Sequence, residues 1–426
     1  MNILFRNIHI VSPSDNINQK TDLLIENGII SSFGSVNKIP DETKIIEAEN
    51  LTCIPGLFDM HVHFRDPGQT DKEDFQTGSK AAMNGGFTGV LIMPNTLPPV
   101  DNPKIIKYIQ DKTSDYLIDV EISACATKKR YGNKLTDIKK LFNNGAVAFT
   151  DDGSPVQNPD ILMKVFEKIS ENHTLFAQHS EDIFLAQGGS MNKGKTSKFL
   201  NLKGIPAISE SYMIARDLLL LQNFKDAKYH AQHISSWLSV EIIRTGKRKK
   251  ANVTAEVCPH HFILTEDECI GGDTNMKMNP PLRTHNDLEN IIEGLKDDTI
   301  DVICTDHAPH TEIEKSQSFQ QAPFGIIGLE TSIALTYTYL VKKKIITFEK
   351  MIEKMSINPR KILNLDSIMI KEGVQANLTI LDLNKEWIID PDKFLSKSKN
   401  TPFSGFEVQC QPYAVINKNK IFFSEL

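Results

Sequence analysis

Two histidines in one apolar run, His61 and His63, are the first candidates for chemistry. A Pro-Gly pair at 55–56 precedes the run and Pro67-Gly68 follows it, which is typical of a strand between turns. Side chains two positions apart in a strand point to the same face, so both imidazoles can bind one divalent metal ion. Because His-x-His also occurs in ordinary strands, the pair alone leaves a structural role equally open.

Further residues of metal-binding type follow other short apolar runs. They are Asn95, Asp151, Asp152, His179, His233, His260, His261, Asp306, His307 and His310. Histidines that arose independently in a core would not be expected to fall so regularly at the ends of strands. Four histidines and two carboxylates suit a pair of divalent ions with a carboxylate between them. Asp151 and Asp152 cannot both point into one site from a strand, and their spacing leaves the choice between them open.

Two polar residues near the first histidines are candidates for substrate binding. The guanidinium group of Arg65 is a planar fork that suits a carboxylate, and Asn95 can add one donor. Arg65 follows His63 by two positions and is therefore expected on the same side. The alternative for Arg65 is a surface ion pair with Asp66 or Asp71.

The run that ends at Thr305 introduces a second cluster, formed by Asp306, His307 and His310. A carboxylate at a strand end can bind metal and also move a proton between water and a leaving nitrogen. We expect His307 to support the site and His310, on a loop, to reach a substrate anion. The polar stretch 312–320 that follows is a candidate for a lid.

Other residues are assigned with their alternatives. Asn279 precedes a Pro pair and fits either a positioned polar contact or a plain loop. His179 has the alternative of a surface residue at a helix start. We expect a structural role for His230, which would lie on the opposite or deeper side of its strand. The His260-His261 pair is also expected to be structural, because no partner pair at zinc-finger spacing exists.

Composition narrows the class of protein. The 426 residues can fill one large domain plus a smaller one, with 40% hydrophobic and 24% charged residues. A net charge of −6 does not favour nucleic-acid binding, and the basic cluster 247–250 fits a solvated helix end. We expect no membrane span and no secretory signal. The six scattered cysteines suggest free thiols in the cytoplasm.

Short apolar runs alternate with helical patterns in the middle of the chain, from 54 to 366. The expected strands are 89–93, 119–126, 146–149, 174–178, 228–233, 252–257 and 301–305, and the expected helices are 75–84, 159–171, 210–221, 236–244 and 286–295. This alternation predicts an α/β fold, a (β/α)8 TIM-like barrel with its chemistry at the carboxyl ends of the strands. A doubly wound open sheet is the alternative, weakened by the lack of a glycine-rich phosphate loop.

The two chain ends share a different, β-rich composition. Expected strands are 3–10, 22–26, 29–33, 377–382, 414–417 and 420–423, with a hairpin turn at Asn27-Gly28. We therefore predict a small β-sandwich domain built from residues 1–53 and 367–426, beside the barrel domain 54–366.

Taken together, these segments resemble the amidohydrolase superfamily and, within it, the bacterial type I dihydroorotases. The resemblance rests on the ordered segments 55–68, 93–96, 149–153, 178–182, 233–235, 254–261, 278–283, 305–310, 322–331 and 400–405. It implies that His61, His63 and Asp306 bind one zinc ion, and that His179 and His233 bind a second. It also assigns the bridging position to Asp152.

The resemblance further implies the roles around the metals. Asp306 would also be the proton shuttle, and the substrate would contact His63, Arg65, Asn95, Asn279, His310 and the backbone at Phe324 and Gly325. The expected reaction interconverts N-carbamoyl-L-aspartate and L-dihydroorotate plus water, in pyrimidine synthesis. Two Zn²⁺ per chain, a small-molecule substrate, a homodimer and an association with aspartate carbamoyltransferase are the corresponding expectations for cofactors and partners.

Two alternatives to this function remain. Allantoinases and dihydropyrimidinases of the same superfamily usually bridge their metals with a carboxylated lysine, and the strand 146–152 contains no lysine. A metal-free, non-catalytic subunit is the other alternative, which the presence of all six ligand types disfavours.

Overall fold

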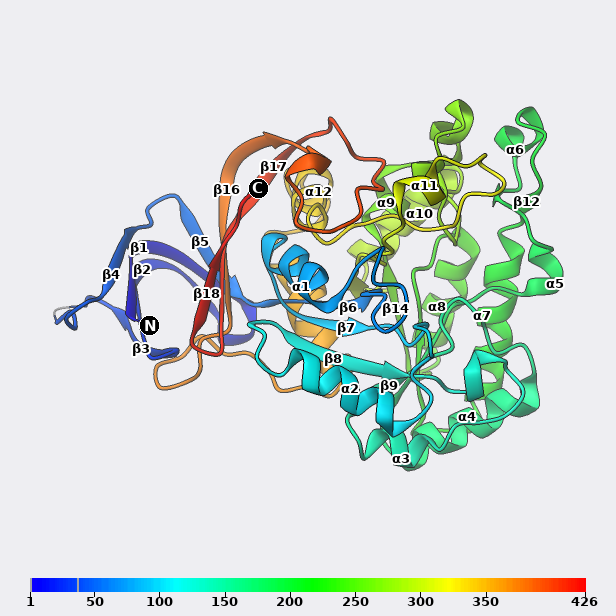
Figure 1. The fold of residues 1–426 in the computed structure, drawn as a ribbon, viewed down its shortest axis with the longest axis horizontal. Helices are drawn as coiled ribbons and strands as arrows, with labels where there is room; N and C mark the ends of the chain where they lie inside the picture. Colours follow the sequence, from blue (N-terminus) through cyan, green and yellow to red (C-terminus); the bar gives the residue numbers. More distant parts are fainter. Residues whose placement is uncertain (1, 37) are drawn as a thin grey trace.

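Eight parallel strands form the barrel in the computed structural model, which describes residues 2–36 and 38–426 (Figure 1). In chain order they are β6 (Leu57–Val62), β7 (Phe87–Ile92), β8 (Asp119–Ala124), β9 (Ala146–Phe149), β10 (Leu175–Gln178), β13 (Lys228–Ala231), β14 (Val253–Val257) and β15 (Val302–Ile303). Neighbours in this order pair with each other. A bridge between Val62 and His307 brings the last strand back to the first. The predicted (β/α)8 barrel is confirmed.

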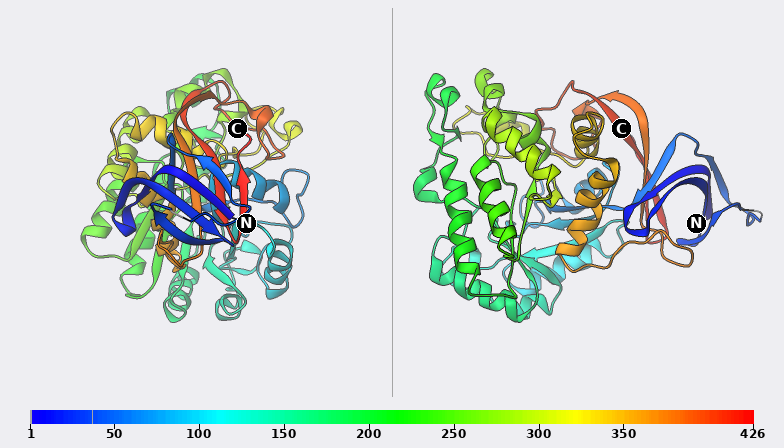
Figure 2. Two further views of the ribbon diagram at one scale, coloured as in Figure 1. Left: turned by 90° about the vertical axis from the view of Figure 1, so that its left-hand side faces the viewer. Right: turned by 180° about the vertical axis from the view of Figure 1, so that it is seen from behind.

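Helices surround this sheet on its outer side (Figures 1 and 2). The longer ones are α1 (Phe75–Asn84), α2 (Pro103–Thr113), α4 (Pro159–Glu171), α7 (Ile208–Leu221), α8 (Trp237–Arg248) and α10 (His285–Lys296). Their sequences explain where they start and which face they bury. Asp74 caps α1 by accepting a hydrogen bond from the Thr77 amide, and α4 buries Ile161, Val165 and Ile169 along one stripe.

Shorter elements fill the loops between these units. They are α3 (Ile138–Phe142), α5 (Ile183–Ala186), α6 (Lys195–Phe199), α9 (Pro259–Ile263), α11 (Glu312–Lys315), α12 (Ser332–Thr336), α13 (Phe348–Ile352) and α14 (Asn358–Ile362), with the short strands β11 (Met191–Asn192) and β12 (Gly204–Ile205). No helix among the described residues is both long and apolar enough to cross a membrane.

Several predicted barrel strands are shorter in the structure than expected, and two of them end before proposed metal ligands. The strand expected over 228–233 ends at Ala231, and the one expected over 301–305 covers only Val302–Ile303. In both places the chain leaves the extended conformation, since φ is 29° at His233 and 48° at Asp306. These turns place both side chains at the rim of the barrel rather than along a strand.

The strands of the two chain ends form a second sheet beside the barrel, at the left in Figure 1. It contains β1 (Asn2–Ser12), β2 (Ile17–Glu26), β3 (Ile29–Gly34), β4 (Lys44–Glu47), β5 (Leu51–Pro55), β16 (Leu378–Ile388), β17 (Glu407–Asn417) and β18 (Lys420–Phe423). The antiparallel pairing of β5 with β16 joins the two ends of the chain. Asn27 and Gly28 have φ of 51° and 80°, as a tight hairpin turn requires.

The sheet encloses a core of its own, which includes Phe5, Ile25, Leu378 and Ile416. Between β16 and β17 the chain leaves this sheet and runs over the barrel, where Phe394 and Phe403 share a hydrophobic cluster with Ile327. Figure 1 draws this segment in orange and red at the upper edge of the barrel. The predicted domain boundaries at 53/54 and 366/367 stay predictions.

Candidate active site

The six residues predicted as metal ligands lie together at the carboxyl ends of the barrel strands. His61 is in β6, and His63, Asp152, His179, His233 and Asp306 follow β6, β9, β10, β13 and β15. Five of the six form two groups of three ligand atoms, one with His61 and His63 and one with His179 and His233. Asp152 belongs to both groups, which is the arrangement that a bridging carboxylate would have.

Asp152 lies between the two histidine pairs. Its Oδ1 is 3.6 Å from His61 Nε2, 3.8 Å from His179 Nδ1 and 3.9 Å from His233 Nε2. Its Oδ2 is 3.6 Å from His63 Nε2. Separations of this size leave room for a cation between donor atoms, since metal–ligand bonds are about 2.0–2.2 Å.

The neighbouring Asp151 faces the opposite way. Its Oδ1 accepts a hydrogen bond of 3.0 Å from the Thr127 amide, and its Oδ2 accepts a second from the Thr127 hydroxyl. The spacing of the sequence could not separate the two aspartates, because the chain turns directly after β9. In the structure one carboxylate faces the histidines and the other fixes a loop.

Hydrogen bonds from the other ring nitrogens orient His61 and His63. His61 Nδ1 lies 2.6 Å from Glu256 Oε1, and His63 Nδ1 lies 2.8 Å from Asn95 Oδ1. An imidazole that donates from Nδ1 to an oxygen keeps the Nε2 lone pair free for a metal. Both Nε2 atoms face Asp306, with His63 Nε2 at 2.9 Å and His61 Nε2 at 3.4 Å from its Oδ1.

One buried ring nitrogen provides a test of whether a metal fits. Among the described residues, His61 Nε2 has no hydrogen-bond partner, and it faces Asp152 and Asp306. A buried polar atom without a partner is costly unless an ion or water satisfies it. The imidazole and carboxylate donors of this cluster are ligands that Zn²⁺ and similar divalent ions prefer. The residues present therefore fit a divalent metal.

The charge states of Asp152, Asp306 and His179 also suit metal binding. Burial works to raise the pKa of Asp152, yet the surrounding imidazoles hold it well below its usual value, and the same holds for Asp306. Burial and the neighbouring His233 lower the pKa of His179 to about 4. At neutral pH these carboxylates are ionised and this imidazole is neutral, which are the states that bind metal.

The predicted substrate contacts line a cavity of about 220 Å³ beside the cluster. Its walls include Arg65, Asn95, Asn279, His310, Phe324 and Gly325, together with His63, Asp152, His179, His233 and Asp306. His61 lies behind this wall. Asn95 Nδ2 donates to Asp152 Oδ2 at 3.1 Å, and Asn279 Nδ2 donates to Glu181 Oε2 at 3.0 Å. The structure thus brings all of these predicted residues to one cavity.

Arg65 is buried and held against the loop that carries His310. Its Nε donates to the Pro309 carbonyl at 3.2 Å, and its second terminal nitrogen lies 3.4 Å from His310 Nε2. Its φ of 60° turns the chain out of the strand direction directly after His63. Among the residues that the structure describes, neither Asp66 nor Asp71 forms an ion pair with Arg65, so the surface alternative is not realised.

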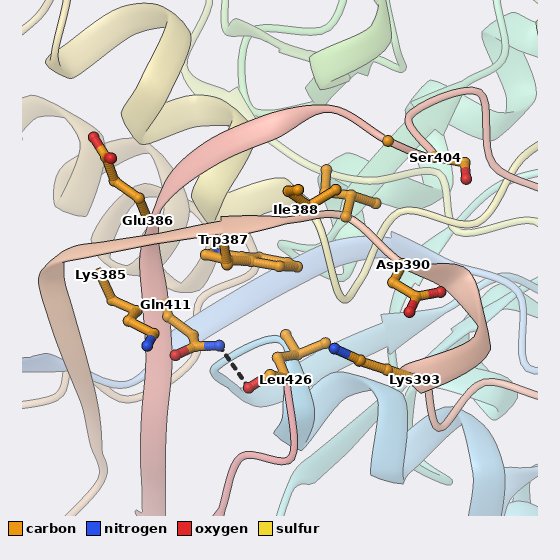
Figure 3. A pocket seen from close by; sticks show the side chains of 11 residues that line it. Lys385, Glu386, Trp387, Ile388, Asp390, Lys393, Ser404, Gln411 and Leu426 are labelled. Atoms are coloured by element: carbon orange, nitrogen blue, oxygen red, sulfur yellow. Dashed lines mark hydrogen bonds between the residues drawn. The ribbon is translucent and has the colours of Figure 1, made fainter.

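A second cavity, of about 730 Å³, lies away from this site, between β16, β17 and the C-terminal Leu426 (Figure 3). Trp387 and Ile388 form its apolar part, and Gln411 hydrogen-bonds to the Leu426 backbone oxygen. None of the predicted site residues lines it. Its larger volume does not make it the better candidate, because it lacks a cluster of groups that could do chemistry.

Glu256, the buried partner of His61, was not predicted from the sequence. It also accepts a hydrogen bond of 3.3 Å from the His233 amide and lies 3.1 Å from His230 Nε2. His230 lies behind the cluster, and its structural role stays a prediction. Glu256 is the one charged residue in the strand 253–257, and this is the signal that could have identified it.

The remaining candidates lie outside the cavity. His261, in α9, contacts the Pro280 carbonyl at 3.0 Å, and His307 lies 3.4 Å from Glu73. The suggested lid begins with α11, whose Glu314 pairs with Lys72 at 2.7 Å. Whether this stretch moves stays a prediction.

Replacing Gly325 by alanine should destabilise the protein and weaken substrate binding. A Cβ at this position would lie 2.6 Å from the Ala308 Cβ and 3.3 Å from His310 Nε2, and φ is +122°. We expect a loss of roughly 1–3 kcal/mol in the free energy of unfolding, measured by denaturant titration, and a raised KM. The control is Gly373→Ala, where φ is +82° and no atom lies within 4 Å. Equal KM values for Gly325→Ala and Gly373→Ala would contradict our expectation that a methyl group at position 325 displaces His310.

A family model and the full-length relatives of this chain indicate the same family. A family model described as dihydro-orotase-like matches residues 51–239. A dihydroorotase of Acetivibrio thermocellus is 43% identical over 98% of each chain, and one of Elusimicrobium minutum is 44% identical over 96% of this chain and 94% of its own. A dihydroorotase of Syntrophus aciditrophicus is 39% identical over the full length of both.

Solved structures show the same fold at lower identity. The L-hydantoinase (dihydropyrimidinase) of Arthrobacter aurescens superposes with a TM-score of 0.88 at 23% identity, covering 100% of this chain and 96% of its own. The dihydropyrimidinase of Brevibacillus agri reaches 0.86 at 20% identity, covering 100% and 95%. These likenesses establish the architecture. Because these dihydroorotases match it over nearly its whole length, the chain belongs to the dihydroorotase family, whose members are hydrolases with a metal cofactor.

Proposed function

We propose that this chain interconverts L-dihydroorotate and N-carbamoyl-L-aspartate, a step of pyrimidine synthesis. The observation that carries the proposal is the position of Arg65 in the cavity that five of the six proposed metal ligands line. The cluster suits attack of water on an amide carbonyl, and the arginine suits a substrate that bears a carboxylate. The dihydroorotases that resemble this chain over nearly its whole length support the same substrate.

We propose Zn²⁺ as the metal, with two ions per chain. His61, His63 and Asp306 would hold one ion, His179 and His233 the other, and Asp152 would contact both. This assignment is supported by the two groups of three ligand atoms that share Asp152. When bound, zinc lowers the pKa of water toward about 7 and polarises a carbonyl oxygen.

Asp306 is the residue that we propose to move the proton. Its side chain lines the cavity, and its carboxylate stays ionised because the imidazoles of His61 and His63 keep its pKa low against the effect of burial. In ring opening it would accept the proton of the attacking water and pass it to the leaving nitrogen. In ring closure it would move the proton in the reverse direction, so no net charge is gained or lost.

The substrate carboxylate would be held by Arg65, Asn95 and His310. Burial of the guanidinium strengthens its hydrogen bonds to an anion, because little water competes for them. Asn279 and the backbone at Phe324 and Gly325, which line the same cavity, would contact the ring. This clamp distinguishes dihydroorotate from cyclic amides that lack a carboxylate.

A hydantoinase or dihydropyrimidinase activity is the second candidate, favoured by the structural neighbours. Two features weigh against it. The resemblance implies a carboxylated lysine in such enzymes, and the segment from β9 to Asp152 contains no lysine. Arg65 would also have no anion to bind in hydantoin or dihydrouracil.

The test is to assay the purified protein with dihydroorotate, dihydrouracil, hydantoin and allantoin in parallel. We expect kcat/KM for dihydroorotate to exceed kcat/KM for the other substrates by about 1,000-fold. A neutral ring would leave the buried Arg65 without an anion to bind, which weakens its binding strongly. Preference for a neutral ring would overturn the proposed substrate.

We also propose a cytoplasmic homodimer that can associate with aspartate carbamoyltransferase. The family resemblance supports both associations. Six buried, unpaired cysteines support a reducing compartment. Light scattering of the purified protein, alone and with that partner, measures the assembly state.

A further inference from the structure

Two separate segments carry the proposed substrate contacts on one wall of the cavity. The first includes Ala308 and His310, and the second includes Phe324 and Gly325. They approach closely, since His310 Nε2 lies 2.8 Å from the Phe324 carbonyl oxygen. The width of the cavity at this wall therefore depends on what holds the two segments together.

Asn400 links these segments from outside the barrel sequence. It lies in the chain between β16 and β17, is 5% exposed, and uses both ends of its amide. Oδ1 accepts a hydrogen bond of 3.1 Å from the His310 amide, while Nδ2 donates to the Ala308 carbonyl at 3.1 Å and the Gly325 carbonyl at 3.2 Å. Its own carbonyl accepts a hydrogen bond of 3.0 Å from the Ile327 amide.

The segment that carries Asn400 is itself fixed by buried carboxylates. Glu330 accepts hydrogen bonds from the amides of Leu395 at 2.7 Å and Ser396 at 3.2 Å. Glu73 accepts one from the Lys397 amide at 3.3 Å. Contacts outside the cavity thus fix the position of Asn400, and its hydrogen bonds in turn fix the cavity wall.

We propose that Asn400 is a positioning residue for the reaction, which sets the spacing between His310 and the backbone at Gly325. Deleting the amide leaves one buried N–H without an acceptor and removes a donor from each of two carbonyls. The Gly325 carbonyl keeps Lys315 Nζ at 2.9 Å, whereas the amide of His310 has no second acceptor among the described residues. His310 is therefore the contact that should move.

This inference rests on the proposed function, and it predicts an effect on substrate binding rather than on the metals. Asn400 hydrogen-bonds to none of the six proposed ligands. We expect Asn400→Ala to raise KM for dihydroorotate by about 10-fold or more, because small displacements of a binding group are expensive. We expect kcat to change by less than about 3-fold and the metal content to stay the same.

A matched control is available in the same C-terminal part of the chain. Asn417 is 2% exposed and donates to the Leu117 carbonyl at 3.1 Å, before β8 and far from the carboxyl ends of the strands. Asn417→Ala should lower Tm without changing KM. The isosteric Asn400→Asp keeps an acceptor for the His310 amide but has no donor for the Ala308 and Gly325 carbonyls. It replaces Asn400→Ala in this test if that variant does not fold.

The outcomes separate this inference from the function on which it rests. Wild-type protein that is inactive on dihydroorotate contradicts the proposed function. An active wild type whose Asn400 variants keep the wild-type KM, or whose Asn417→Ala variant shows the same rise in KM, contradicts the positioning role alone. A loss of bound metal in the Asn400 variants would also contradict it.

Discussion

Asp306→Ala should abolish the hydrolysis of dihydroorotate, with kcat/KM falling by at least about 1,000-fold. Its carboxylate has two proposed roles, metal binding and proton transfer, that no neighbouring side chain can take over. It lies 2.9 Å from His63 Nε2 and 3.4 Å from His61 Nε2, where it would hold a metal, and it lines the cavity, where it would move the proton. Steady-state rates in both directions measure the effect.

An aspartate at the other end of the same strand provides the control. Asp301 precedes β15, pairs with Lys247 at 2.7 Å and accepts a hydrogen bond from the Ala255 amide. Asp301→Ala should lower Tm and leave kcat/KM within about 3-fold, since it lies at the end of the barrel away from the cluster. Nearly full activity in folded Asp306→Ala protein would contradict the role assigned to Asp306.

The adjacent aspartates give the second large prediction. Asp152→Asn should reduce bound metal from about two ions per chain to one or fewer, and activity should fall by about 100-fold or more. An amide cannot supply two anionic oxygens between two cations. Elemental analysis of the dialysed protein, compared with its activity, measures both effects.

Asp151→Asn is the matched control, one residue away. Its side chain faces Thr127, and an asparagine can keep the hydrogen bond to the Thr127 amide. We expect metal content near the wild-type value and a modest change in Tm. If Asp151→Asn lost metal and Asp152→Asn retained it, the proposed bridging position would be assigned to the wrong aspartate.

The barrel was predictable because its signals are local. The stripe of apolar residues in α1 and α4 repeats every three to four positions, and both helices have the bounds expected from the sequence. Runs such as 146–149 end where polar residues begin, which located the carboxyl ends of the strands and therefore the site. The shortened strands before His233 and Asp306 were not predictable, because their ends depend on backbone turns set by neighbouring segments.

The supporting contacts of the site could not be predicted from spacing. Glu256 lies 195 positions from His61, and Asn400 lies 90 positions from His310. Only the fold brings these pairs together, and the type of residue does not name its partner. Spacing also could not separate Asp151 from Asp152, because their side chains point in different directions where the backbone turns after β9.

Reconstitution of metal-free protein measures how many metal ions the reaction needs. Protein stripped with a chelator would receive increasing Zn²⁺ while its hydrolysis of dihydroorotate is measured. We expect almost no activity without metal and a plateau at about two equivalents per chain, because Asp152 joins two groups of three ligand atoms. Full activity in the stripped protein, or a plateau at one equivalent, would contradict this expectation.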